Sequence, residues 1–95
     1  MEFDFDAEII EWRGPSPYLF AALPPELADE LALAAKDFTY GWGCIPASGR
    51  LGRTDFTTSL FPRNGGYLVP IKRAVQRAEQ VGLGDVIHLE LRVGD

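Results

Sequence analysis

The sequence is poor in the residues from which most catalytic and metal-binding sites are built. Its 95 residues include one cysteine, one histidine and one methionine. The single cysteine, Cys44, cannot form a disulfide within the chain, which is typical of proteins from reducing compartments. Cys44 and the only histidine, His88, are too few ligands for a tetrahedral zinc site. We therefore expect neither a metal centre nor a cofactor.

Long apolar runs and a basic N-terminus are also absent. No apolar segment approaches the roughly 20 residues that cross a bilayer. The first residues, MEFDFDAEIIEW, are acidic, unlike the basic start of a secretion signal. The sequence therefore predicts a cytoplasmic protein without a membrane segment. A hydrophobic fraction of 46% and a charged fraction of 24% are ordinary for a globular protein, and 95 residues favour one domain over residues 1–95.

Charge is distributed unevenly along the chain, whose net charge is −5. Residues 38–77 hold six basic side chains and one acidic side chain. Residues 1–37 hold two basic and nine acidic side chains, and residues 78–95 hold one basic and four acidic side chains. A basic block of this kind can form an anion-binding face. Alternatively, the fold interleaves the three blocks so that their charges cancel.

Apolar and polar residues alternate along several short segments, as in strands with one buried face. From Phe3 to Ile9 apolar residues alternate with acidic ones, and a phase shift at Ile10 predicts a bulge near Ile9. Further strands are predicted over residues 18–23, 38–45, 56–61, 67–69 and 87–93. A glycine-rich segment over residues 48–52 predicts a connection between two of them. Asn64-Gly65-Gly66 predicts a tight hairpin, because type I′ turns need positive φ at both central residues.

Two segments that begin with proline predict helices over residues 24–36 and 70–81. Proline at a first helical position costs no hydrogen bond, and apolar residues follow at helical spacing in both segments. The predicted order of elements is β-β-α-β-β-β-α-β. Short strands with only two short helices favour a mainly β fold, a small and partly open β-barrel with the helices packed at its openings.

Four segments of the sequence resemble a known family. They are GWGCIP at residues 41–46, TDFTTSLFPR at 54–63, GYLVPIK at 66–72 and GLGDV at 82–86. Together they are similar to the domain of unknown function 1905 family, small bacterial and archaeal proteins that are sometimes fused to bacteriocin-protection (YdeI/OmpD-associated) modules. The resemblance implies a double-split β-barrel, the fold class of swapped-hairpin transcription factors of the AbrB and MazE kind. It implies no activity.

A candidate ligand-binding site lies in the basic block. Trp42 stands between two glycines, which let a ligand come close. Ser59 belongs to a run of hydroxyl residues, and Arg63 and Lys72 stand at either end of the predicted hairpin. We predict that these four residues bind a ligand. No residue is predicted to be catalytic, since a lone cysteine in an aromatic and glycine-rich strand is typical of a small buried hydrophobe.

The sequence leaves three functions open. The leading hypothesis is a noncatalytic binding module for an anionic small molecule or a partner protein. The second is nucleic-acid binding as a dimer, motivated by the resemblance to AbrB-like factors and opposed by the net negative charge. The third is an enzyme of unknown reaction. Since two β-β-α halves can close a barrel within one chain, we expect a monomer that dimerises at most weakly.

Overall fold

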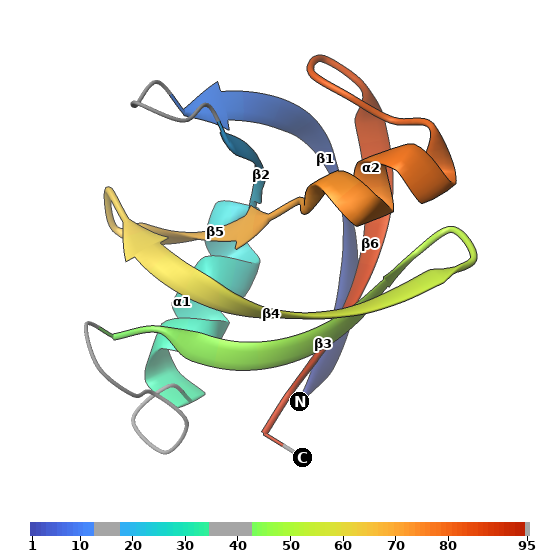
Figure 1. The fold of residues 1–95 in the computed structure, drawn as a ribbon. Coiled ribbons are helices and arrows are strands. Elements are labelled where there is room, and N and C mark those ends of the chain that lie inside the picture. Colours follow the sequence, from blue (N-terminus) through green and yellow to red (C-terminus); the bar gives the residue numbers. More distant parts are fainter. Residues whose placement is uncertain (13–17, 35–42, 95) are drawn as a thin grey trace.

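The computed structural model describes residues 1–12, 18–34 and 43–94. The elements follow the predicted order. They are β1 (Glu2–Trp12), β2 (Tyr18–Ala22), α1 (Pro25–Ala34), β3 (Ile45–Leu51), β4 (Thr54–Arg63), β5 (Gly66–Pro70), α2 (Arg73–Glu79) and β6 (Val86–Val93). The prediction of a mainly β barrel with two short helices is confirmed (Figure 1).

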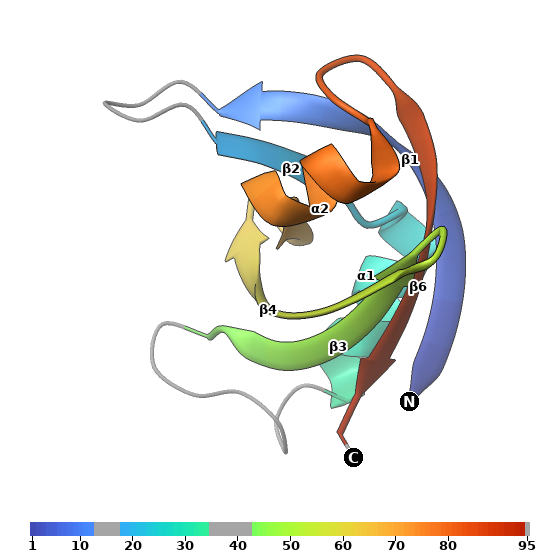
Figure 2. The same ribbon diagram turned by 45° about the vertical axis from the view of Figure 1, so that its right-hand side comes forward.

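The six strands form a closed antiparallel barrel in the order β1-β2-β5-β4-β3-β6. Figure 2 shows the strands curving around a common interior. The two longest strands divide their length between two partners. Residues 2–8 of β1 pair with β6 and residues 9–12 with β2, while residues 54–60 of β4 pair with β3 and residues 61–63 with β5. The barrel therefore consists of sheet A (β1, β6, β3, β4) and sheet B (β1, β2, β5, β4), and it is closed where the sequence predicts a partly open one.

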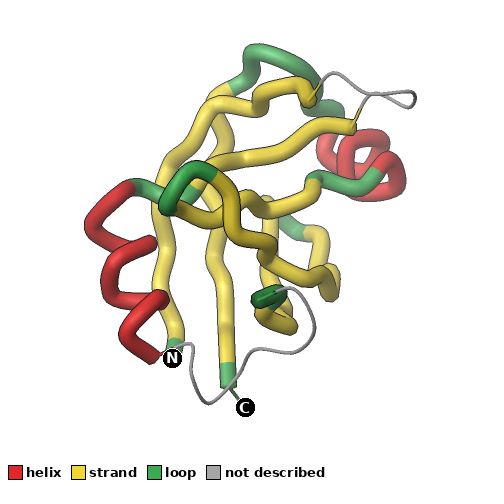
Figure 3. Tube along the Cα trace, turned by 90° about the vertical axis from the view of Figure 1, so that its left-hand side faces the viewer, coloured by secondary structure: helices red, strands yellow, loops and turns green. Residues whose placement is uncertain are grey.

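The second half of the chain repeats the connectivity of the first. In both halves a long strand forms a hairpin with a short strand, and a helix and a further strand follow. The strand after each helix pairs with the long strand of the other half, β3 with β4 and β6 with β1. The two helices lie on opposite sides of the barrel (Figure 3). Neither helix of the described chain is long and apolar enough to cross a membrane.

The core is filled by alternate residues of the strands and closed by buried apolar side chains of both helices, Ala28 and Leu31 in α1 and Val75 in α2. Strand β6 shows the pattern most clearly, since every second residue from Ile87 to Val93 is buried. The predicted bulge near Ile9 is wrong. Ile9 is 0% exposed and Ile10 is 40% exposed, and both ladders of β1 run without an extra residue. Ile10 is apolar although it faces outward, which explains the apparent phase shift.

Strand β3 begins where the sequence predicts that a strand ends. It covers Ile45–Leu51, so most of the predicted connection at residues 48–52 is strand, and the turn contains only Gly52 and Arg53. Gly49 lies in this strand, paired with Phe56 and Leu91, and only glycine fits there, because an ideal Cβ would lie 2.7 Å from Phe56 Cζ and 2.8 Å from Leu91 Cδ2. Residues 38–42 of the predicted strand lie outside the described residues.

Both helices differ from their predicted bounds at the ends that the structure describes. Helix α1 begins at Pro25, one residue later than predicted, and residues 35 and 36 lie outside the described part. Helix α2 covers only Arg73–Glu79 within the predicted 70–81. Pro70 belongs to β5 and Gln80 adopts a left-handed conformation that ends the helix. At Pro70, pairing within the sheet therefore overrides the preference of proline for the first turn of a helix.

Candidate functional site

The structure places three of the four predicted ligand-binding residues along β4 and next to it. Ser59 is half-buried on β4 opposite Pro46, and Arg63 is the exposed last residue of that strand. Lys72 precedes α2, and its Nζ donates a hydrogen bond to the Thr57 carbonyl oxygen at 2.8 Å. Trp42 lies outside the described residues.

Lys72 and Arg63 belong to different parts of the surface. The Lys72 ammonium is held at Thr57, six residues from Arg63 along an extended strand. At about 3.3 Å per residue this separation is about 20 Å along β4. Residues 54–60 of β4 pair with β3 on one side only, so the Lys72 bond satisfies a carbonyl at a strand edge. Lys72 therefore ties α2 to the barrel, while Arg63 lies by the β4–β5 hairpin.

Arg63 lines a cavity of about 560 Å³ on the outer side of sheet B. The cavity lies between β2, the first turns of α1 and the β4–β5 hairpin. Its apolar wall comprises Ile10, Phe20, Ala22, Leu23, Pro25, Ala28 and Leu68. Its polar groups belong to Glu11, Asp29, Arg63, Asn64 and Tyr67.

Local sequence signals explain how these elements meet. Asn64 and Gly65 have φ of 51° and 79°, which confirms the predicted tight hairpin and holds Arg63 opposite Gly66. On β2, Phe20 points away from the barrel core and packs edge-on against Phe61, with ring centroids 5.1 Å apart. Phe20 is nevertheless only 6% exposed. It therefore forms an apolar base under the cavity.

The cavity joins residues from three elements that are far apart in the sequence. Arg63 of β4 and Asp29 of α1 line it, and so does Glu11 of β1, whose pairing with the core-packed Leu19 places its side chain on the opposite face of β1 from Ile10. Within the described residues, neither Glu11 nor Asp29 makes an ion pair or a side-chain hydrogen bond. The site can therefore offer a planar cationic donor and a carboxylate beside an apolar wall.

A family model described as a domain of unknown function, DUF1905, matches residues 5–91 of this chain. The chain belongs to the DUF1905 family. The matched region runs from Phe5 on β1 to Leu91 on β6 and includes every described residue of the cavity wall. No curated protein matches the chain. Because the family description states no activity, the function of this DUF1905 protein has to be inferred from its geometry.

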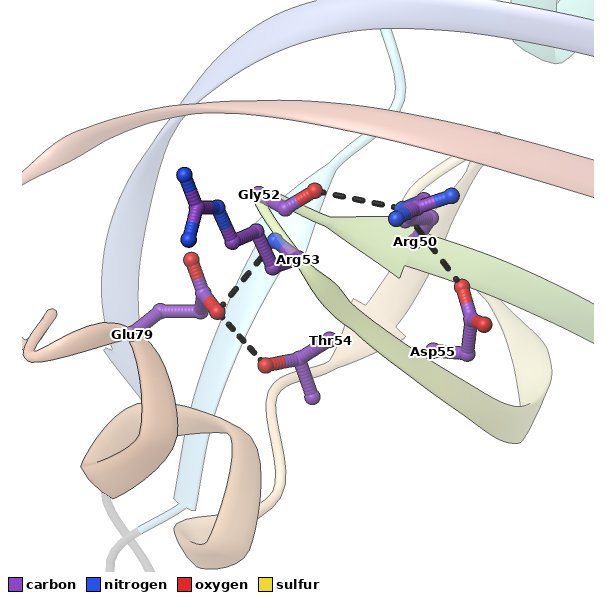
Figure 4. Close-up of polar contacts among 6 residues, drawn as sticks. All are labelled: Arg50, Gly52, Arg53, Thr54, Asp55 and Glu79. Atoms are coloured by element: carbon purple, nitrogen blue, oxygen red, sulfur yellow. Dashed lines mark hydrogen bonds and ion pairs between the residues drawn. The ribbon is translucent and has the colours of Figure 1, made fainter.

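The outer face of sheet A in this DUF1905 protein carries charges that pair with one another. Arg92 Nε lies 2.8 Å from Glu2 Oε1, and Arg50 Nε lies 3.7 Å from Asp55 Oδ1 and donates to the Gly52 carbonyl oxygen at 3.2 Å (Figure 4). These groups surround a second hollow of about 720 Å³. Arg50 is paired with Asp55, and Arg63 lies six residues along β4 from the carbonyl that binds Lys72, so Arg63 lies apart from the other two.

Glu79 holds the C-terminal end of α2 on the β3–β4 turn, a contact that the sequence did not predict. Its Oε2 accepts hydrogen bonds from Thr54 Oγ1 at 2.6 Å and from the Arg53 backbone N–H at 3.3 Å (Figure 4). A negative charge is disfavoured at a helix C-terminus, so these two bonds offset an unfavourable position. Gly52 has φ of +60°, and an ideal Cβ there would collide with Glu79. The turn and the helix are therefore fitted to each other.

His88 lies outward on β6 between two aspartates of β1. Its Nδ1 is 2.6 Å from Asp6 Oδ1 and its Nε2 is 3.0 Å from Asp4 Oδ2. Since a neutral imidazole has one N–H and an imidazolium has two, this geometry fits the charged form. The hydrogen bond with Asp6 is the largest cause that raises the pKa of His88 above 6.5, and the charges of both aspartates add to it against desolvation.

No catalytic or metal-binding grouping is found among the described residues. Cys44 is half-buried just before β3, and no described hydrogen bond joins it to His88. Groups of three or more His, Cys, Asp or Glu side chains that could hold a metal ion are also not found in this part of the chain. Glu11, Asp29 and Phe20 were not predicted as site residues, because nothing in their local sequence distinguishes them from ordinary strand and helix residues.

Proposed function

We propose that this DUF1905 protein is a noncatalytic binding module that takes a small molecule with an apolar body and an anionic group. The observation that carries the proposal is the position of Arg63 at a cavity with an apolar wall. The volume of about 560 Å³ lies within the roughly 300–1,000 Å³ of typical ligand pockets. We further propose that the protein is cytoplasmic and monomeric, or at most a weak dimer.

The wall and the guanidinium have separate roles in this proposal. Apolar contact with Phe20 and Leu68 supplies affinity, at about 2.5 kcal/mol for each ~100 Å² of apolar ligand surface removed from water. Arg63 supplies orientation, because its planar N–H donors match the two oxygens of a carboxylate or a phosphate. Among the described residues of the lining there is no cysteine, histidine, serine or lysine, so these residues do not supply the usual pairs of nucleophile and base.

Binding can be tested by a thermal-shift screen followed by calorimetry with hydrophobic carboxylates and phosphate esters. We expect stabilisation by ligands that combine an apolar body with an anion. An Arg63→Gln variant should bind them about 10- to 100-fold more weakly, the equivalent of one charge-assisted hydrogen bond or pair. Arg77→Gln is the matched control, since Arg77 is exposed on α2 and does not line the cavity. Equal affinity of the Arg63 and Arg77 variants, or no stabilisation by any such compound, would refute the proposal.

A further inference from the structure

Helix α2 carries a concentration of positive charge that the cavity does not use. Four exposed cations lie on this helix or next to it, namely Lys72, Arg73, Arg77 and Arg53. Together with the carboxylate of Glu79, the acidic residue of the helix, they sum to +3. The other residues of the chain hold five basic and thirteen acidic side chains, a net charge of −8. Helix α2 is therefore a basic element on an acidic protein.

The fold does not account for this charge, because α1 has an equivalent place and the opposite charge. The residues that lead into the two helices are held in the same way. The Leu23 N–H donates to the Tyr67 carbonyl oxygen at 3.0 Å before α1. The Ile71 N–H donates to the Leu19 carbonyl oxygen at 2.9 Å before α2. Helix α1 contains three acidic residues and no basic one, and it lies on the other side of the barrel (Figure 3).

The outward side of α2 presents two neighbouring guanidinium groups on a low surface. Val75 is buried in the core, whereas the side chains that form this side are exposed: Arg73, Ala74, Arg77 and Ala78. We call these four residues the α2 face. Residues four apart on a helix are neighbours, so the two arginines repel each other. Neither of them makes an ion pair or a side-chain hydrogen bond with any described residue.

We propose that the α2 face binds an acidic segment of another protein. This surface is separate from the cavity, since no residue of α2 lines either of the two hollows described above. The outward side of a helix is convex, whereas sites for small molecules are concave. Carboxylates one turn apart on an acidic helix, or two residues apart on an extended segment, have the spacing of Arg73 and Arg77. Each guanidinium can bind a carboxylate through two N–H groups, and the two alanines let the partner come close.

A protein segment matches this face better than a nucleic acid does. Helix α2 has seven residues and is therefore about 10 Å long, which leaves room for two or three charges of a partner. Contacts to about 6–10 phosphates are common in proteins that bind DNA through its backbone. A longer polyanion would extend over the rest of the surface, where the net charge of −8 repels it. A short acidic segment ends within the α2 face.

Fluorescence anisotropy with labelled poly-L-glutamate tests the proposal on the full chain. We expect the wild type to bind this probe with an affinity that falls as salt is added, and to bind an oligothymidylate of the same length more weakly. Arg73→Gln combined with Arg77→Gln should weaken the binding of poly-L-glutamate about 3- to 30-fold at low salt, the effect of losing two exposed ion pairs.

The matched control combines Arg50→Gln with Arg92→Gln. This variant loses the same amount of positive charge from the outer face of sheet A, where both arginines are ion-paired. It should bind poly-L-glutamate as the wild type does, because neither residue belongs to the α2 face. Denaturation midpoints of both double variants, measured in parallel, show whether each remains folded.

Three results would overturn the proposal. The first is equal affinity of the two double variants for poly-L-glutamate, or no binding of this probe by the wild type. The second is tighter binding of the oligothymidylate, which would assign the α2 face to a nucleic acid. The third is self-association of the wild type that the Arg73 and Arg77 substitutions abolish, which would assign the face to the acidic α1 of a second copy. None of these results bears on the cavity, because Arg73 and Arg77 do not line it.

Discussion

Replacement of Gly49 by alanine tests how tightly the interior of the barrel is filled. Gly49 is paired with Phe56 on β4 and with Leu91 on β6. An ideal Cβ at this position would lie 2.7 Å from Phe56 Cζ, 2.8 Å from Leu91 Cδ2 and 3.0 Å from the Glu90 carbonyl oxygen. The side chains can shift, but the Glu90 oxygen belongs to the backbone of a strand that is paired on both sides.

The expected cost follows from two opposing effects. Overpacking a core by one methyl group costs about 1–3 kcal/mol. Loss of glycine's freedom in the unfolded chain returns about 0.4–1 kcal/mol. We therefore expect Gly49→Ala to lower the free energy of unfolding by about 1–2 kcal/mol. For a domain of this size that corresponds to a fall in melting temperature of roughly 4–16 °C.

The assay is urea denaturation followed by circular dichroism, with Gly82→Ala as the control. Gly82 has no heavy atom within 4 Å of an ideal Cβ and no positive φ, so its replacement should leave stability unchanged or raise it slightly. A second substitution that replaces the facing phenyl ring by a shorter side chain, Phe56→Leu, should restore part of the stability that Gly49→Ala removes. If Gly49→Ala is as stable as the wild type, the barrel interior beside Phe56 and Leu91 has room for a methyl group and the reasoning is wrong.

Three further predictions concern charge and assembly. His88→Gln should destabilise the protein most at pH values below 6.5, because the pKa of His88 is higher in the folded protein than in the unfolded chain. The stabilisation by His88 is complete below the unfolded-state pKa and disappears as pH rises through the folded-state pKa. Denaturation of both proteins at low salt, from below pH 6.5 to above the folded-state pKa, tests this, and a loss of stability that grows with pH would contradict it. Glu79→Ala should lower the free energy of unfolding by about 1–2 kcal/mol, because the hydrogen bonds to the β3–β4 turn are lost. In a protein that already carries Thr54→Val, Glu79→Ala should cost less. If the costs of Glu79→Ala and Thr54→Val simply add, the two side chains act independently and the prediction is wrong. Light scattering over a dilution series should give a folded monomer, and a dimer that persists to nanomolar concentration would refute this expectation.

Much of the fold can be predicted from the sequence because its signals are local. Alternation along β6 depends only on which face of one strand is buried, and it predicts that strand nearly to the residue. The hairpin at Asn64 and Gly65 follows from the φ values that a two-residue turn requires. Failures occur where packing overrides local preference. Gly49 is a typical connection residue by composition, but it lies in a strand that pairs with β4 and β6, at a position where the interior has room only for a hydrogen.

The candidate site is less predictable than the fold. Arg63 was predicted and lines the cavity, whereas Ser59 and Lys72 were predicted beside it and do not line it. Their grouping rested on closeness in the sequence, and an extended strand separates residues that a compact turn would bring together. Glu11 and Asp29 are the opposite case, because they lie more than 30 residues before Arg63 in the sequence and still line the same cavity. Nothing in the sequence around them marks them as residues of a site.

By itself, the sequence determines the family, the order of strands and helices, and the tight hairpin that presents Arg63. The elements and the hairpin each depend on residues within a few positions of one another, and the family on the pattern of residues 5–91. The tertiary structure alone decides that the barrel closes, that β1 and β4 each serve two sheets, and that Arg63 shares a cavity with Glu11 and Asp29. The physical reason is that these features arise from pairing between distant strands and from the packing of α1 beside β5, which no local pattern encodes.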